Sequence, residues 1–195
     1  MTTLHRALTD PPLPLLPRAA DDLLRSLDAP PRLAAHLRAV HDAARDLLGW
    51  LATRHPAVAV DHEAVLFGAA THDIGKCPHP AELAGPGSAH EIEGHRLLLA
   101  HGVPERLARF ARTHASWTDA GTTFEDHLVS LADKVWKAKR VPDLEQLVVD
   151  RLAGATPGWE VFMELDDLLT GIADRADSRL AFQNAYPITG ASQVL

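Results

Sequence analysis

The sequence has one cysteine, Cys77, and few aromatic residues, which make up 5% of its 195 residues. A single cysteine cannot form an intramolecular disulfide, so a disulfide-stapled scaffold is excluded. Long hydrophobic runs are also absent, since no apolar stretch approaches the roughly 18 residues of a membrane-spanning helix. The N-terminus lacks the basic, apolar and small-residue order of a secretory signal. We therefore expect a soluble, cytoplasmic protein that does not act at a membrane.

Positive charge is also scarce. The 19 Lys and Arg residues are outnumbered by 26 Asp and Glu, which gives a formal net charge of −7 with neutral histidines. A chain of this charge repels polyanions, so we expect no binding to duplex nucleic acid, although a small anion could be bound locally. Histidine, in contrast, is abundant at 12 residues. This enrichment in imidazole indicates metal binding.

The hydrophobic residues, 46% of the chain, are enough for the core of one domain. Their spacing is helical, and no convincing strand pair or internal repeat is present. The stripe from Leu33 to Leu51 predicts a helix of about five turns after Pro30-Pro31. Further helices are predicted to start at Asp61, at Ser88 with a capping box to Glu91, at Pro104, after Gly121, at Pro142 and near Trp159. The sequence therefore predicts an all-α fold, a single helical bundle.

The chain ends differ from this helical body in composition. Residues 1–18 contain Pro11, Pro12, Pro14 and Pro17, which remove backbone donors and predict an extended N-terminal arm. We expect the folded domain, with a C-terminal helical extension, to cover residues 19–185. Residues 186–195, which contain Gly and Ser, are predicted to be a tail.

The string His72-Asp73-Ile74-Gly75-Lys76 lies at a predicted helix end. An adjacent His and Asp offer a nitrogen and two carboxylate oxygens to a metal in one small volume. Such a pair is weak by itself, because most single motif matches are false. Other metal-ligating residue types also fall on predicted helices, and a bundle core can gather ligands from facing helices. They are His36, His90, His114 and Asp133.

This ordered series resembles the HD superfamily of metal-dependent phosphohydrolases over roughly residues 30–140. The resemblance rests on the HDIGK string, on His90 with Gly94 four residues later, and on Leu131-Ala132-Asp133. It implies an HD-domain bundle with two metal ions in its core, bridged by the carboxylate of Asp73. The remaining ligands that it implies are His36, His72 and Asp133 on one ion, and His90 and His114 on the other. Four imidazoles and two carboxylates suit divalent Fe, Mn, Co, Ni or Zn better than Ca or an oxygen-only Mg site.

The first ligand is left open by periodicity. His36 and His41 flank the same apolar stripe at its two edges, at nearly equal angles. The first helix of the family usually has a β-branched residue four positions after the histidine and an alanine eight positions after it. Val40 and Ala44 match this pattern for His36. We therefore predict His36 as the first ligand.

Four residues near the predicted ligands are candidates for substrate binding. Lys76 could neutralise a substrate phosphate, or it could be a helix-end cation favoured by the helix dipole. Lys134 begins a basic run, and Arg112 could clamp a phosphate or be an ordinary exposed arginine. Trp117 could form an aromatic wall on which a base stacks.

The resemblance implies a hydrolase that cleaves a phosphoester of a small phosphorylated molecule, such as a nucleotide or a related metabolite. A metal-bridging hydroxide would attack phosphorus, with Asp73 and Lys76 as catalytic residues. The alternative is a mixed-valent di-iron oxygenase, a minority branch of the superfamily with the same ligand order. A catalytically silent regulatory domain is a third possibility, which the complete ligand series disfavours. Residue spacing does not name the substrate or the oligomeric state.

Overall fold

The structure, a computed structural model, describes residues 1–154 and 156–188. The regular secondary structure in these ranges is helical. No strand occurs in those ranges, so the prediction of an all-α fold is confirmed. None of the helices described there is long and apolar enough to cross a membrane. In chain order the α-helices are α1 (Thr3–Thr9), α2 (Arg18–Ser26), α3 (Pro31–Arg54), α4 (His62–Thr71), α5 (Ala89–Ala100), α6 (Glu105–Ala108), α7 (Phe110–Thr113), α8 (Phe124–Val135), α9 (Pro142–Leu152), α10 (Gly158–Ala173) and α11 (Ala176–Asn184). Two short 3₁₀ helices, η1 (Ile74–Lys76) and η2 (Pro80–Leu83), connect α4 to α5.

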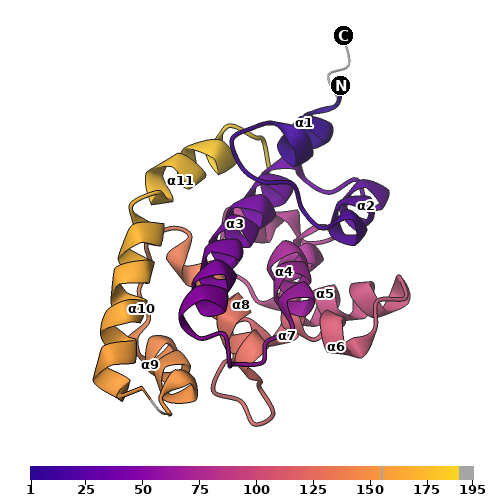
Figure 1. Cartoon of the computed structure of the whole chain (residues 1–195). Helices are drawn as coiled ribbons and strands as arrows, with labels where there is room; N and C mark the ends of the chain where they lie inside the picture. The colour runs from indigo at the N-terminus through magenta and orange to yellow at the C-terminus, as the bar shows by residue number, and fades with distance from the viewer. Residues whose placement is uncertain (155, 189–195) are drawn as a thin grey trace.

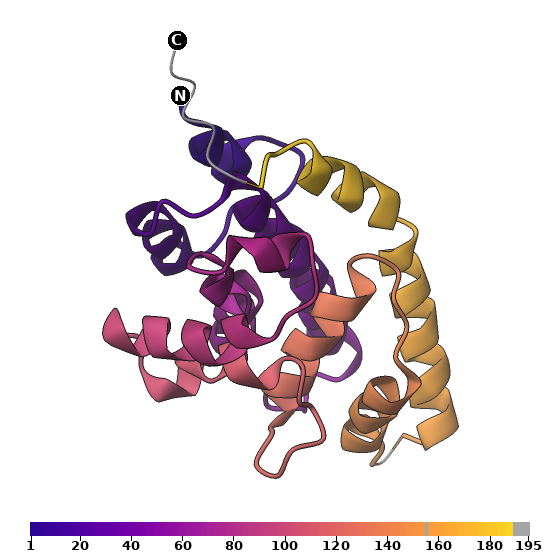
Figure 2. The same cartoon turned by 180° about the vertical axis from the view of Figure 1, so that it is seen from behind.

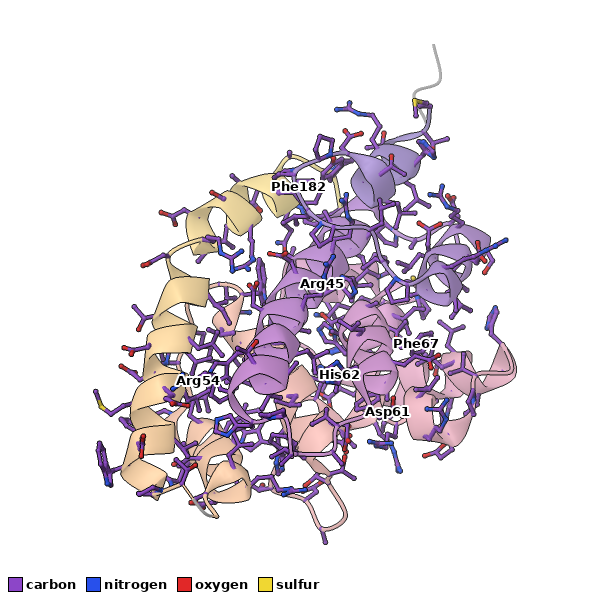
Figure 3. The ribbon with its side chains drawn as sticks, viewed as in Figure 1. Arg45, Arg54, Asp61, His62, Phe67 and Phe182 are labelled. Carbon is purple, nitrogen blue, oxygen red and sulfur yellow. The ribbon has the colours of Figure 1, made fainter. Side chains whose placement is uncertain are left out.

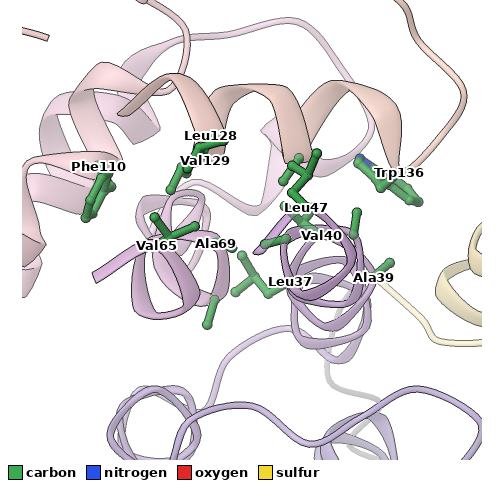
Figure 4. Close-up of a cluster of buried hydrophobic side chains, with 14 of the residues drawn as sticks. Leu37, Ala39, Val40, Leu47, Val65, Ala69, Phe110, Leu128, Val129 and Trp136 are labelled. Carbon is green, nitrogen blue, oxygen red and sulfur yellow. The ribbon is translucent and has the colours of Figure 1, made fainter. Parts of the chain in front are cut away.

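Helix α3 runs through the middle of the molecule, with the other helices packed around it (Figures 1 and 2). It begins at Pro31, whose fixed φ suits the first helical position, and continues for 24 residues. Its predicted apolar stripe is buried, and Figure 4 shows Leu37 and Val40 in one cluster with Val65 of α4 and Leu128 of α8. Full burial of each such side chain contributes roughly 1.5–3 kcal/mol relative to exposure. Helices α3, α4 and α8 therefore form a rigid platform.

Helix α4 begins where its sequence predicts, and it ends at Thr71, short of Gly75, where the sequence predicts its end. The side chain of Asp61 accepts a hydrogen bond from the backbone N–H of Ala64 at 3.0 Å, and Figure 3 shows Asp61 at the start of the helix. The C-cap of α4 is His72, so His72 and Asp73 lie at a helix end as predicted. Both side chains are buried there.

A close backbone contact joins η1 to α5. A Cβ atom on Gly75 would lie 2.0 Å from the carbonyl oxygen of His90 and 2.6 Å from the backbone nitrogen of Gly94. Only a residue without a side chain allows this approach. The glycine of the HDIGK string and the glycine four residues after His90 therefore have one physical role, which is to bring the His72-Asp73 pair and His90 together.

The start of α5 differs from its prediction. Ser88 is the N-cap, but its side chain makes no capping hydrogen bond, so the predicted capping box to Glu91 is wrong. The carboxylate of Glu82 from η2 accepts hydrogen bonds from the N–H groups of Ala89 at 3.2 Å and His90 at 3.3 Å. A carboxylate from a neighbouring segment thus replaces the hydroxyl, and it also fits the dipole at the helix N-terminus.

Two predicted helices are each divided in the structure. The helix predicted to start at Pro104 is split into α6 and α7, and the helix predicted to start near Trp159 is split into α10 and α11. Figures 1 and 2 show α10 and α11 following one side of α3. The break after α10 lets the chain stay on α3, which a straight continuous helix would leave.

The N-terminal arm is partly helical, so the prediction of an extended arm over residues 1–18 is wrong for α1. Its first proline is Pro11, and the preceding residues are free to form a helix. Thr2 caps this helix by accepting a hydrogen bond from the backbone N–H of His5 at 3.2 Å. Beyond Pro11 the chain is irregular as far as Pro17.

Buried arginines attach both chain ends to α3. Arg38 is fully buried and donates hydrogen bonds to the carbonyl oxygens of Ala7 at 3.0 Å and Asp10 at 2.8 Å, so the N-terminal arm belongs to the folded domain. Arg179 of α11 is 1% exposed and donates to Asp42 at 2.7 Å. Tyr186, where the tail was predicted to begin, is also buried. Residues 189–195 of the predicted tail lie outside the described residues.

We expect Gly75→Ala to destabilise the fold by at least about 2 kcal/mol, because the added methyl group collides with the backbone of α5 and cannot be relieved by a side-chain rotation. Urea denaturation followed by circular dichroism measures the free energy of unfolding. Gly49→Ala is the matched control, since Gly49 lies in α3 and nothing lies within 4 Å of the place that its added methyl group would take. That control should raise stability by about 0.5–1 kcal/mol. Equal stability of the two variants would contradict the close contact.

Candidate metal centre

Six buried His and Asp side chains meet in the core of the bundle, between α3, α4, α5, α7 and α8. They form two groups, and the ligand atoms within each group lie within 4.8 Å of one another. One group is His36, His72 and Asp133, and the other is Asp73, His90 and His114. The structure thus brings together every residue predicted as a ligand, in the partition that the sequence resemblance implied.

The carboxylate of Asp73 lies between the two groups and presents one oxygen to each. Its Oδ2 atom is 3.1 Å from Nε2 of His36 and 3.7 Å from Nε2 of His72. Its Oδ1 atom is 3.1 Å from Nε2 of His90 and 3.6 Å from Nε2 of His114. A carboxylate placed in this way can bind one ion through each oxygen.

Asp133 completes the first group from the last turn of α8. Its Oδ1 atom is 3.4 Å from Nε2 of His72 and 3.9 Å from Nε2 of His36. The second group has no matching carboxylate among the described residues, so its donors are two imidazoles and Asp73. The two groups are therefore chemically unequal.

Each imidazole of the centre is oriented by a hydrogen bond on its other ring nitrogen. The Nδ1 atoms face oxygen acceptors, so they carry the proton and leave Nε2 free to bind a metal. The acceptors are Gln183 Oε1 for His36 at 3.1 Å, Ala69 O for His72 at 3.1 Å, Glu82 Oε2 for His90 at 2.5 Å and Ala111 O for His114 at 3.0 Å. This arrangement is the one expected of histidine ligands.

Two of the Nε2 atoms, those of His36 and His72, are buried and have no hydrogen-bond partner. A buried polar atom without a partner costs about 1–3 kcal/mol. A bound cation would satisfy both atoms, and a mixed imidazole and carboxylate donor set suits a divalent transition metal. The residues of the centre therefore fit a metal site.

The ionisation of three of the ligands, Asp73, His114 and His36, agrees with this conclusion. Burial opposes charge on Asp73, but the surrounding imidazoles, His72 foremost, outweigh it and hold the pKa of this carboxyl well below its usual range. Burial lowers the pKa of His114 to about 4, and it also lowers the pKa of His36. At neutral pH these two imidazoles are uncharged, which is the state that binds a metal. For His90, the carboxylates of Asp73 and Glu82 outweigh burial and raise the pKa.

Two of the predicted substrate-binding lysines lie at the edge of the centre. The Nζ atom of Lys76 is 2.6 Å from Asp73 Oδ2, and that of Lys134 is 2.6 Å from Asp133 Oδ2. Lys134 also lies 5.6 Å from the centre of the Trp117 ring, which places Trp117 beside the same edge. Both lysines are in position to meet an anion that approaches the carboxylates.

Arg112 is not brought to this edge. It is exposed on α7, and among the described residues its side chain donates to Glu105 at 3.3 Å. The neighbouring Arg109 donates to Asp126 at 3.1 Å and supports the start of α8. A phosphate contact by Arg112 remains a prediction that this arrangement does not favour.

His41 lies outside both groups of ligands, so the structure selects His36 at the position that periodicity left open. His41 is buried on another side of α3, where it lines a cavity with Leu15, Leu16 and Pro17. Burial lowers its pKa to about 4. The N-terminal arm, and not the metal centre, is its neighbour.

A cavity of about 150 Å³ adjoins the centre next to His36. The residues that line it are Arg32, His36, Lys76, Leu83, Trp136, Lys137 and Gln183. Sequence reasoning did not assign Arg32, Lys137 or Gln183 to the site. Gln183 is separated from His36 by 147 positions, so no local pattern connects the two residues.

A helical bundle that brings two buried His and Asp groups together around one carboxylate could hold metal ions in its core. The family model described as HD domain matches residues 33–138, more than half of the chain. The chain therefore belongs to the HD domain family, whose members bind divalent metals and are generally hydrolases. No curated protein and no solved structure matches the chain.

We expect Asp73→Asn to weaken metal binding at both groups, because the neutral carboxamide loses the negative charge that faces both of them and keeps one oxygen in place of two. His114→Ala should mainly empty the group that contains His90 and leave the other metal in place. Elemental analysis of protein purified without chelator measures the metal per chain, with two expected for the wild type. Circular dichroism confirms that each variant is folded. Full metal occupancy in a folded Asp73→Asn variant would refute the bridging role.

Gln183→Leu should lower the affinity for the metal held by His36 about tenfold, because the acceptor that fixes the ring and its proton is lost. Gln183→Glu keeps an acceptor oxygen and should retain the affinity. Competition with a chromogenic chelator measures both values. Gln146→Leu, on the exposed face of α9, is the control. A Gln183→Leu variant that binds as the wild type does would show that α11 leaves the centre unaffected.

Proposed function

We propose that this protein is a metal-dependent phosphohydrolase that cleaves a phosphoester of a small phosphorylated molecule. The observation that carries the proposal is the position of Asp73, which presents one carboxylate oxygen to each of two buried ligand groups. Two divalent ions are accordingly proposed, drawn from Fe, Mn, Co, Ni and Zn. When bound, such a pair supplies Lewis-acid polarisation of a phosphoryl oxygen and lowers the pKa of water.

The lysines at the edge of the centre support a phosphorylated substrate. Lys76 lies against Asp73 and also lines the cavity next to His36, so it can meet a phosphate that enters from the cavity. Lys134 lies against Asp133 and provides a second cation. Cations fixed near the position of the reacting group neutralise its charge and stabilise the additional charge that develops in the transition state.

Burial of the ligand groups supports a reaction that is shielded from bulk solvent. His72 and Asp73 are at most 3% exposed, whereas the Lys76 side chain is 17% exposed. The centre therefore opens to solvent at its lysine edge, where a substrate would enter. Trp117, close to Lys134, is in position to contact the part of the substrate that is not cleaved.

The reaction class can be tested with a panel of nucleoside mono-, di- and triphosphates, sugar phosphates and phosphodiesters. The assay is run without O₂, with Mn, Co or Ni added, and it measures released phosphate or nucleoside. We expect hydrolysis of at least one member, because the reaction needs no change of oxidation state. Asp73→Asn is the inactive control.

A different result would contradict the hydrolase proposal. If every member of the panel is left intact, and the iron-loaded protein takes up O₂ in the presence of a phosphonate or a polyol, the hydrolase proposal is wrong. The di-iron oxygenase then becomes the function.

A further inference from the structure

The cavity next to His36 is lined by hydrogen-bond donors. Apart from the metal ligand His36, its polar side chains carry N–H groups, and none of them is a carboxylate. These side chains are Arg32, Lys76, Trp136, Lys137 and Gln183. The protein has a net charge of −7, so three cations around one cavity are a local reversal of its overall charge. Such a lining selects an anion.

The indole of Trp136 gives independent support for a bound anion. Its Nε1 atom is buried and has no hydrogen-bond partner, although the ring packs edge-on against His36 with 5.0 Å between ring centres. An indole N–H can only donate. Leaving it unpaired costs free energy that a bound acceptor would recover. Trp136 lines the cavity, so the residue that carries this unsatisfied donor belongs to the cavity wall, together with the three cations.

Gln183 and Arg32 each use part of their hydrogen-bonding groups in contacts within the protein. The Oε1 atom of Gln183 accepts from His36, which leaves its NH₂ group as the part that can contact a ligand. Arg32 donates to the carbonyl oxygens of Tyr186 at 2.9 Å and Asn184 at 3.3 Å, which holds its side chain at the cavity. Among the described residues, neither Arg32 nor Lys137 forms a salt bridge with a carboxylate.

The size of the cavity limits what it can take. Its volume of about 150 Å³ is below the roughly 300–1,000 Å³ of pockets for drug-sized ligands. A compact anionic group fits this space and this lining better than a nucleobase, which is larger and needs acceptors as well as donors. Lys76 lines the cavity and also contacts Asp73, so the cavity and the metal centre adjoin each other.

We propose that this cavity is a second anion subsite, which binds a phosphate of the substrate other than the one that is cleaved. This inference rests on the proposed function, since it assigns the preferred substrates as small molecules with two phosphate groups. The phosphate to be cleaved lies at the His and Asp groups. The second phosphate is held by Arg32, Lys137, Trp136 and Gln183.

Two residues of the subsite lie outside the part of the chain that the family model matches. The family match covers residues 33–138, so Arg32 and Gln183 lie outside it. Gln183 is on α11, and the carbonyl groups that hold Arg32 follow it directly. The C-terminal extension therefore supplies specificity to a centre whose ligands come from the family domain.

Binding of two hydrolysis-resistant probes tests the subsite. Propylphosphonate and 1,3-propanediphosphonate differ by one phosphonate, and neither has an ester bond. Calorimetric titration of the protein with its metals, without O₂, should show that the diphosphonate binds at least tenfold more tightly. In Lys137→Ala the ratio of the two dissociation constants should fall about tenfold or more, as expected for loss of a charged hydrogen bond.

Two further variants make the test specific. Lys139→Ala removes a nearby exposed lysine that does not line the cavity, and it should keep the wild-type ratio. Trp136→Phe keeps a ring against His36 but removes the N–H, and it should lower the ratio by a smaller factor. Metal analysis after each titration controls for removal of the ions by the probes.

Failure of the subsite can be distinguished from failure of the proposed function. Equal binding of the two probes by the wild type, or equal ratios in Lys137→Ala and Lys139→Ala, overturns the subsite even if the phosphoester panel is hydrolysed. Tight diphosphonate binding that depends on Lys137 supports the subsite even if no ester is cleaved. In that last case only the hydrolase proposal is wrong.

Discussion

The contact of one buried carboxylate with four imidazoles is the interaction on which this structure depends. Asp73 is 3% exposed, and a carboxylate at that depth is costly unless charges and donors surround it. The imidazoles come from four different helical segments, so the packing of α3, α4, α5 and α7 has to bring them to one point. This requirement explains the glycine at position 75. Any side chain there would push η1 away from α5 and separate Asp73 from His90.

The family domain and its flanking segments have different parts in this arrangement. Residues 33–138 supply all six side chains of the candidate metal centre. The segments outside it add Gln183, which orients the ring of His36, and Arg32, which lines the adjoining cavity. Arg38 and Arg179 attach these flanking segments to α3 through buried hydrogen bonds. The described flanking segments are thus packed on the helices of the family domain, and they shape the approach to the centre more than the centre itself.

Local hydrogen bonding explains why some boundaries differ from the predictions. Ser88 was expected to cap α5, but Glu82 caps it and at the same time accepts from His90 Nδ1. The prolines at 11–17 were expected to keep the arm extended, but they lie beyond α1 and leave it free to form. At α5 a competing acceptor decided the boundary, and at α1 the residues before the first proline did. Neither difference changes which residues reach the metal centre.

The sequence alone predicted the helical class and the main helices, because helical periodicity is a local property, and the resemblance of its His and Asp motifs to the HD superfamily implied the six ligands. Periodicity left His36 and His41 equivalent by angle, and the pattern of the family favoured His36. Packing against α4 and α8 places His36, and not His41, beside Asp73. Gln183 carries no local signal, since its partner is 147 positions away. The donor-lined cavity, too, exists only because α11 returns to α3. Contacts between distant segments depend on how whole helices pack, which the pattern within one helix does not specify.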